Sequence, residues 1–175
     1  MPNPTLGRVD PQVEVDRLQA PLSVRDVALR HMEQHLSRWG VVLPPAEPLV
    51  LDFGLEDFQH VGLVECWIAN EVSSGYCGKY LFLADAQRCP EHYHEGKHET
   101  FFIVRGTAQM VVDGRPQSLD AGAVLPMPPR CVHGFSGAGP VLILEVSTPC
   151  LPADNHFTDP RVDAWLRRVT GNGQG

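Results

Sequence analysis

The chain has 175 residues, with 14 Lys and Arg against 21 Asp and Glu, so its formal net charge is −7. That length fits one domain able to bury roughly 70% of the surface of its unfolded chain. The acidic balance argues against nucleic acid or an anionic membrane as partner, because both need clustered cations. No apolar run approaches the ~18–20 residues that span a bilayer, and the polar, Pro-broken N-terminus does not resemble a secretory signal. We therefore expect a cytoplasmic protein.

The five cysteines form no CxxC pair. This odd, scattered set argues against a disulfide framework or a thiolate zinc site. We expect free thiols in a reducing compartment.

Taken in chain order, residues 1–21 are expected to be an irregular arm, and residues 22–40 a helix. Ser23 is the predicted cap of this helix and Gly40 its stop. His31 and His35 stand at i, i+4 on it; such a pair can bind a metal, but no carboxylate completes a known pattern, and an exposed pair is the preferred interpretation.

The pattern changes after the helix. Short apolar runs separated by turn residues predict an antiparallel sandwich or barrel over about residues 50–150, and Asp113-Gly114 predicts a tight hairpin. Asp159 and Pro160 predict the start of a C-terminal helix over 159–170. We expect one domain, 1–175. The apolar runs are Val61–Ala69, Tyr80–Ala84, Thr100–Val104, Ala108–Val112, Ala123–Pro126 and Val141–Val146.

Histidine and glutamate gather between positions 92 and 133. His92 and His94 point the same way in an extended strand, Glu99 begins the next apolar run, and His133 follows the hairpin. Taken singly, each of these histidines is better explained as a structural residue than as a metal ligand. Together, three imidazoles and a carboxylate form a mixed site suited to Mn²⁺, our first choice, or to Fe²⁺, Co²⁺, Ni²⁺ or Zn²⁺, with positions left open for a substrate.

These residues resemble the motifs of the cupin superfamily. His92-x-His94-x₄-Glu99-x₆-Gly106 is similar to its first motif, and Gly122-x₅-Pro128 followed by His133 to its second. The resemblance implies a mainly β fold, a double-stranded antiparallel β-barrel (jelly roll) with a metal in its mouth, flanked here by the N-terminal helix and the short C-terminal one.

The sequence departs from the cupin pattern at two positions. Ala86 and Arg130 stand where glycine is usual. Arg130 must therefore tolerate an awkward turn, or it reaches the pocket instead.

A narrower resemblance is to the D-lyxose ketol-isomerase family. It is carried by Tyr76–Lys79, Cys89–His94, Gly96–Phe101, Leu144–Ser147 and Phe157–Arg161. It implies an enzyme that interconverts a small free sugar with its ketose, such as D-lyxose with D-xylulose or D-mannose with D-fructose. Cupin barrels often pair, so we expect a homodimer. Members often carry extra residues between the two motifs, which are joined here by one hairpin.

Aldose–ketose interconversion moves a proton between C1 and C2, or shifts a hydride. The proton route needs a base, for which Glu145 is our candidate provided that its strand turns it inward. Lys97 is the second catalytic candidate, as a cation that neutralises an enediolate oxygen or donates a proton; the plainer interpretation is a solvated loop lysine.

Two other functions remain open from the sequence. The same ligand set serves cupin oxygenases and lyases, and a cupin can also be a non-catalytic sugar sensor.

Overall fold

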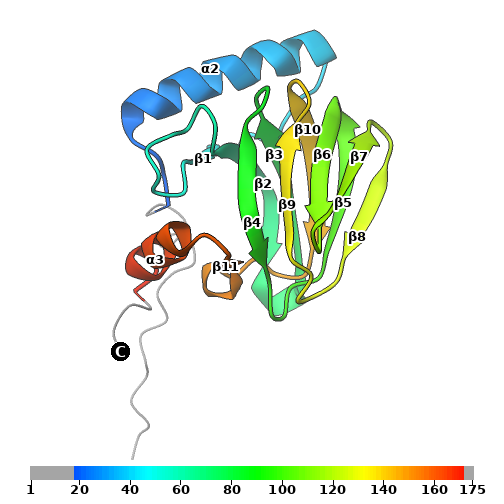
Figure 1. Ribbon diagram of the computed structural model, residues 1–175. Coiled ribbons are helices and arrows are strands. Elements are labelled where there is room, and N and C mark those ends of the chain that lie inside the picture. Colours follow the sequence, from blue (N-terminus) through cyan, green and yellow to red (C-terminus); the bar gives the residue numbers. More distant parts are fainter. Residues whose placement is uncertain (1–17, 172–175) are drawn as a thin grey trace, which may run out of the picture.

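The computed structural model describes residues 18–171, so most of the expected N-terminal arm lies outside the described residues. The described chain is mainly strand, with one helix at each end (Figure 1). Helix α2 spans Leu22–Trp39 and α3 spans Pro160–Val169. The strands are β1 (Leu49–Leu51), β2 (Leu63–Glu71), β3 (Tyr76–Leu83), β4 (Arg88–Tyr93), β5 (Glu99–Arg105), β6 (Thr107–Val112), β7 (Arg115–Asp120), β8 (Val124–Met127), β9 (His133–Gly137), β10 (Val141–Ser147) and β11 (His156–Phe157), and the short 3₁₀ turns are Val72–Ser74 and Pro152–Asp154.

Two antiparallel sheets face one another. The six-stranded sheet has the order β1-β2-β3-β10-β5-β8, and the five-stranded sheet has the order β11-β4-β9-β6-β7. From β3 onward the chain crosses repeatedly between the two sheets, as in a jelly roll, so that β4 and β5 lie in different sheets (Figure 1). The predicted double-stranded antiparallel barrel with two flanking helices is confirmed.

Alternation along the strands divides the apolar residues between two cores. On β10, Val141 and Ile143 point into the barrel, whereas Leu142 points outward. The outward residues of one half of the six-stranded sheet are covered by α2, through Ala28 and Met32. Helix α2 therefore leaves the barrel interior free for the site.

The expected helix and hairpin boundaries can be compared with the structure. Asp113 (φ 47°) and Gly114 (φ 73°) form the tight β6–β7 turn, as predicted, and Gly40 (φ 62°) ends α2. Asp159 caps α3 by accepting from the backbone N–H of Arg161 at 2.9 Å.

The prediction that Ser23 caps the first helix is wrong. The helix begins one residue before it, and no side chain caps it. The carbonyl of Pro21 instead accepts from the N–H groups of Val24 (2.9 Å) and Arg25 (3.1 Å). Pro21, with its fixed φ, already directs the chain into the helix, so Ser23 lies within the first turn.

Both departures from the cupin motifs fall on left-handed backbone. Ala86 has φ 58° and Arg130 φ 66°, conformations in which glycine carries no side-chain strain. The Arg130 side chain is exposed and pairs with Glu95 at 2.8 Å, so it accommodates the turn and does not enter the barrel.

No helix among residues 18–171 is long and apolar enough to cross a membrane.

His31 and His35 lie side by side on α2, with their Nε2 atoms 3.1 Å apart and both rings near Phe82.

Candidate active site

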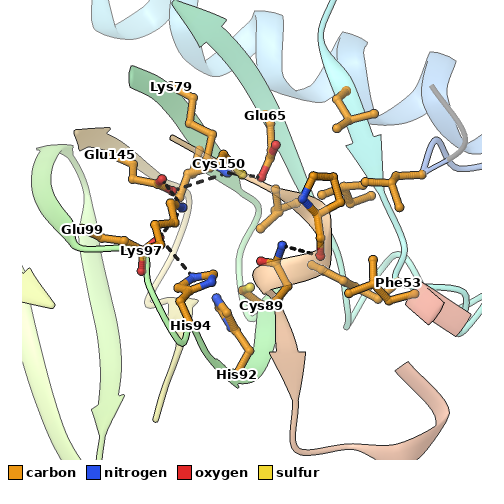
Figure 2. Close-up of a pocket in the computed structure, with 18 of the residues that line it drawn as sticks. Phe53, Glu65, Lys79, Cys89, His92, His94, Lys97, Glu99, Glu145 and Cys150 are labelled. Atoms are coloured by element: carbon orange, nitrogen blue, oxygen red, sulfur yellow. Dashed lines mark hydrogen bonds and ion pairs between the residues drawn. The ribbon is translucent and has the colours of Figure 1, made fainter. Parts of the chain in front are cut away.

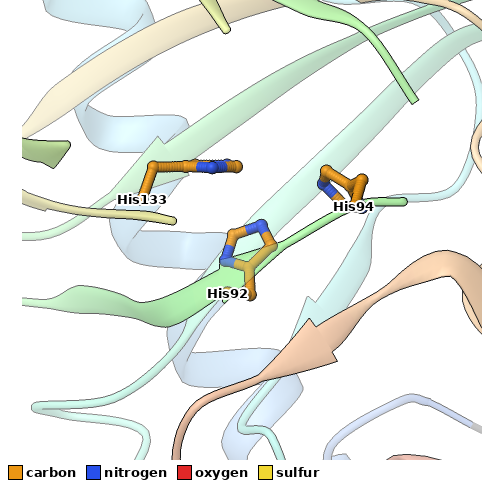
Figure 3. Close-up of side chains that lie close together, drawn as sticks. All are labelled: His92, His94 and His133. Carbon is orange, nitrogen blue, oxygen red and sulfur yellow. The ribbon is translucent and has the colours of Figure 1, made fainter. Parts of the chain in front are cut away.

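Two paired strands bring the predicted histidines together. His92 on β4 is the direct cross-strand partner of His133, the first residue of β9, and His94 follows β4 two positions on. All three are buried, and one ring nitrogen of each lies within 4.8 Å of the others (Figure 3). The i, i+2 spacing thus places His92 and His94 on the inner face, as expected from the sequence.

Backbone carbonyls fix the orientation of all three rings. Nδ1 of His92 lies 2.9 Å from the carbonyl oxygen of Pro90, and Nδ1 of His133 lies 3.0 Å from that of Cys131. Nδ1 of His94 lies 2.9 Å from the carbonyl oxygen of Asp154. Since a carbonyl only accepts, each Nδ1 carries the proton, and each Nε2 presents a lone pair to the shared centre.

Glu99, the first residue of β5, completes this group. Its Oε2 lies 3.1 Å from Nε2 of His133, and its Oε1 lies 3.4 Å from Nε2 of His94. Among the described residues, Nε2 of both histidines and Oε2 of Glu99 are buried without a hydrogen-bond partner. Buried acceptors that converge in this way fit a divalent cation, which three imidazoles and one carboxylate would hold.

The charge states suit the same role. Burial and the neighbouring rings of His133 and His94 hold the pKa of His92 well below its ordinary value, so the ring is neutral. Burial alone would raise the pKa of the Glu99 carboxyl, but the ammonium of Lys97, together with the rings of His133 and His94, holds the pKa well below its usual range. Neutral imidazole and ionised carboxylate are the forms that bind metals.

Lys97 and Glu145 lie next to this centre. Lys97 Nζ is 2.5 Å from Glu99 Oε1 and 2.5 Å from Glu145 Oε1. Glu145 points inward from β10 and is 2% exposed, and Lys97 is 4% exposed, so neither is a solvated residue. Burial alone would lower the pKa of Lys97, but Glu145 and Glu99 raise it well above its ordinary value, and the side chain is an ammonium.

A second buried ion pair was not predicted from the sequence. Lys79 on β3 donates from Nζ to Oε1 of Glu65 on β2 at 2.8 Å, and Nζ also lies 3.5 Å from Oε2 of Glu145. Figure 2 shows these side chains turned toward the same interior as His92 and His94. One signal was available in the sequence, since Lys79 and Lys97 are its only two lysines.

The contacts that the chain after β10 makes with the site were also not predicted. The Asp154 carboxylate accepts from the backbone N–H groups of Glu95 (2.9 Å) and Lys97 (2.9 Å), which fixes the loop between β4 and β5. Phe157 on β11 packs on His92, with ring centroids 5.2 Å apart. This segment closes one side of the cavity, whose other lining residues include Leu51, Phe53, Trp67, Leu81, Cys89, Phe101, Phe135, Asn155, Trp165 and Leu166.

Comparison with known proteins agrees with this geometry. The cupin domain family model matches residues 80–147. The D-lyxose ketol-isomerase of Cohnella laeviribosi is 31% identical, over 71% of this chain and 84% of that protein. The D-lyxose/D-mannose isomerase of Thermosediminibacter oceani is 30% identical, over 65% of this chain and 77% of that protein.

Solved structures extend the likeness in fold. The ligand-free L-ribose isomerase of Cellulomonas parahominis superposes with a TM-score of 0.68 at 18% identity, covering 86% of this chain and 97% of its own. The L-ribose isomerase of Geodermatophilus obscurus gives 0.67 at 16% identity, over 85% and 97%.

The barrel and the histidine cluster in it define a cupin. Within that superfamily, the chain belongs to the D-lyxose ketol-isomerase family. It is a sugar isomerase, which removes the oxygenase, lyase and sensor alternatives.

Proposed function

We propose that this isomerase interconverts a small free aldose with its ketose, D-lyxose with D-xylulose or D-mannose with D-fructose, using a divalent metal. One observation carries the proposal: three Nε2 lone pairs and the Glu99 carboxylate converge beside the buried Lys97–Glu145 pair. The names of the relatives from Cohnella laeviribosi and Thermosediminibacter oceani support the choice of sugars.

The proposed metal ligands are His92, His94, Glu99 and His133. Mn²⁺ is the preferred ion, because a mixed nitrogen and oxygen set with room for further ligands suits it, although Zn²⁺, Fe²⁺, Co²⁺ and Ni²⁺ also accept such a set. When bound, the metal supplies Lewis acidity for the oxygens at C1 and C2.

Glu145 and Lys97 are the proposed catalytic residues. In the aldose-to-ketose direction, Glu145 removes the proton from C2, exchanges it in part with solvent, and delivers a proton to C1. The C1 oxygen gains a proton and the C2 hydroxyl loses one, so the product is an isomer and nothing is consumed. The Lys97 ammonium lies beside Glu145 and balances the negative charge that develops on these oxygens.

The charge of the cavity favours a free sugar over a sugar phosphate. Among the described residues that line it, the only cations are Lys79 and Lys97, and carboxylates already pair with both. Three carboxylates, those of Glu65, Glu99 and Glu145, face these two ammonium groups. Neither ammonium group is therefore left free to pair with a phosphate, whereas a neutral sugar needs no such partner.

The test starts from metal-stripped protein. Mn²⁺ is added back, and D-lyxose, D-mannose, L-ribose and other aldoses are followed by NMR in D₂O. We expect ketose to form only with metal, and deuterium to appear at C2 of the aldose during the reverse reaction. Glu145→Gln should keep the metal and lose turnover. If no pentose or hexose reacts in the metal-loaded protein, the proposal is wrong.

We also propose that the working form is a homodimer, paired through the outer face of the six-stranded sheet that α2 leaves uncovered. Phe102 on β5 lies between Leu144 on β10 and Val124 on β8, and Val146 is two residues further along β10. Phe102, Val124 and Val146 are 36%, 60% and 52% exposed. Neighbouring apolar side chains on one sheet face are typical of a protein interface.

The proposed cellular compartment is the cytoplasm. All five cysteines are free thiols, four of them buried, as is usual where the surroundings are reducing.

A further inference from the structure

The two lysines of the chain have an unusual placement. All twelve other cationic side chains are arginines, yet Lys79 and Lys97 are both buried in the barrel, 5% and 4% exposed. Burying an ammonium is costly unless a carboxylate pairs with it, so each position needs a reason. The proposed proton transfer gives one for Lys97 and none for Lys79.

Lys79 is held in place by side chains from two neighbouring strands and from the loop after β10. Its Nζ donates to Glu65 Oε1 on β2 at 2.8 Å and stands 5.0 Å from the centre of the Trp67 ring. On the other side, β10 pairs with β3 so that Glu145 is the direct partner of Lys79, and Nζ lies 3.5 Å from Glu145 Oε2. Cys150 Sγ lies 4.0 Å from the same nitrogen. A lysine with this many neighbours has little freedom to rotate.

The contacts of Glu145 are divided between its two oxygens. Oε1 accepts from Lys97 Nζ at 2.5 Å and from the Ser147 hydroxyl at 3.0 Å. Oε2 faces Lys79. An ammonium group on each side fixes the carboxylate plane, and a proton acceptor must be held in one orientation to meet a C–H bond.

Lys79 does not resemble a group that exchanges protons during turnover. Burial alone would lower its pKa, but Cys150, Glu145 and Glu65 around it raise the pKa well above the ordinary value. A permanent cation acts through its charge and position.

We propose that Lys79, anchored by Glu65, is a positioning residue that holds Oε2 of Glu145 and so orients the proton acceptor of the isomerase. This rests on the proposed role of Glu145. It assigns Glu65 no contact with the substrate, because Glu65 acts through Lys79.

The first test is a double-mutant cycle on the metal-loaded enzyme. Lys79→Met should lower kcat by about 10²-fold while KM changes by less than about threefold, because orientation and not binding is lost. Glu65→Gln should lower kcat less, since the ammonium remains. The double variant should fall no further than Lys79→Met; independent, additive losses would overturn the proposal. The double variant also removes both charges together, so it tests the idea if Lys79→Met alone fails to fold.

A matched control removes an ion pair of similar length elsewhere. Arg167 pairs with Asp163 at 2.7 Å on the surface of α3, and Arg167→Met should leave kcat and KM unchanged. Metal content, measured on every variant, should equal that of the wild type, because neither Lys79 nor Glu65 is a proposed ligand. Loss of metal from Lys79→Met would contradict a pure positioning role.

A second readout needs neither metal nor substrate. With [ε-¹³C]lysine, the protein gives two side-chain signals, which Lys79→Met assigns. Relative to the metal-free wild type, metal-free Glu145→Gln should shift the Lys79 signal as well as that of Lys97, and metal-free Glu65→Gln should shift the Lys79 signal most. If Glu145→Gln leaves the Lys79 signal in place, the contact and the proposal fail. Absence of turnover in the wild type would instead defeat the proposed function, so the two failures are distinguishable.

Discussion

Gly106, the last residue of the first cupin motif, is required by both its backbone and its surroundings. It turns the chain from β5 to β6 at φ 79°, and a Cβ there would collide with the carbonyl oxygen of Pro140. Gly114 in the β6–β7 turn has a similar φ of 73°, but a Cβ there would meet nothing within 4 Å. Glycine is therefore required at position 106 by close packing as well as by the backbone conformation.

We predict that Gly106→Ala lowers the free energy of unfolding by about 2–4 kcal/mol, the sum of left-handed strain and a forced shift of Pro140. Gly114→Ala should cost only about 1 kcal/mol, because strain alone applies. Urea unfolding of both variants measures the difference. Equal losses would mean that the collision is relieved without cost.

At this scale, the sequence predicts what is local. His92 and His94 share a face because alternation over two residues decides it, and the motif spacing added Glu99 and His133 to the same group. Lys79 and Glu65 could not be found in that way. Their meeting with Glu145 depends on the register of β2 with β3 and of β3 with β10, and β10 is far from the other two strands in the sequence.

The 3₁₀ turn Pro152–Asp154 acts on the site through a single residue, Asp154. The Asp154 carboxylate accepts hydrogen bonds from the N–H groups of Glu95, Gly96 (3.2 Å) and Lys97. Its backbone carbonyl accepts a hydrogen bond from Nδ1 of His94. The carboxylate thus fixes the loop that carries Lys97, while the backbone orients a proposed metal ligand.

We predict that Asp154→Ala lowers kcat about tenfold, since the loop loses three hydrogen bonds and Lys97 its fixed position. Amide exchange at residues 95–97 should become faster, as hydrogen-exchange mass spectrometry would show. Asp154→Asn, which keeps one acceptor oxygen, should have a smaller effect, and Asp163→Ala on α3 none. A slower enzyme with unchanged exchange would contradict this account.

Whole elements were predictable where they were apolar. Strands β5, β6 and β10 follow predicted runs closely, whereas β7 and β9 lay outside every run. The sequence of β7 is polar because its strand is at a sheet edge, and β9, His-Gly-Phe-Ser-Gly, contains two glycines where neighbours come close. A Cβ at Gly134 would press on Glu91, and at Gly137 it would press on the carbonyl oxygen of Ala84. Such strands are specified by their neighbours, not by their own propensity.

For the molecule as a whole, the proposed metal should add stability. The ligands come from β4 and the residue that follows it, from β5 and from β9, so a bound ion would connect the two sheets. We predict that Mn²⁺ at 100 times its Kd raises the free energy of unfolding by about 2.7 kcal/mol. Differential scanning fluorimetry should show a higher Tm that EDTA reverses. His133→Ala should abolish the shift, and His98→Ala, beside the site but exposed, should keep it.

The second prediction for the whole molecule concerns the uncovered sheet face. If two copies pair there, burial of Val146 and its neighbours removes apolar surface from water. An aspartate substituted into that patch would place a carboxylate in the interface without a partner. Val146→Asp should therefore dissociate the dimer while leaving each barrel folded, because Val146 is solvent-exposed in the single chain. Light scattering after size-exclusion chromatography should give twice the chain mass for the wild type and the chain mass for Val146→Asp. Val42→Asp, at a valine that is 91% exposed outside this face, should remain dimeric. A monomeric wild type would refute the dimer, and a dimeric Val146→Asp would place the interface elsewhere.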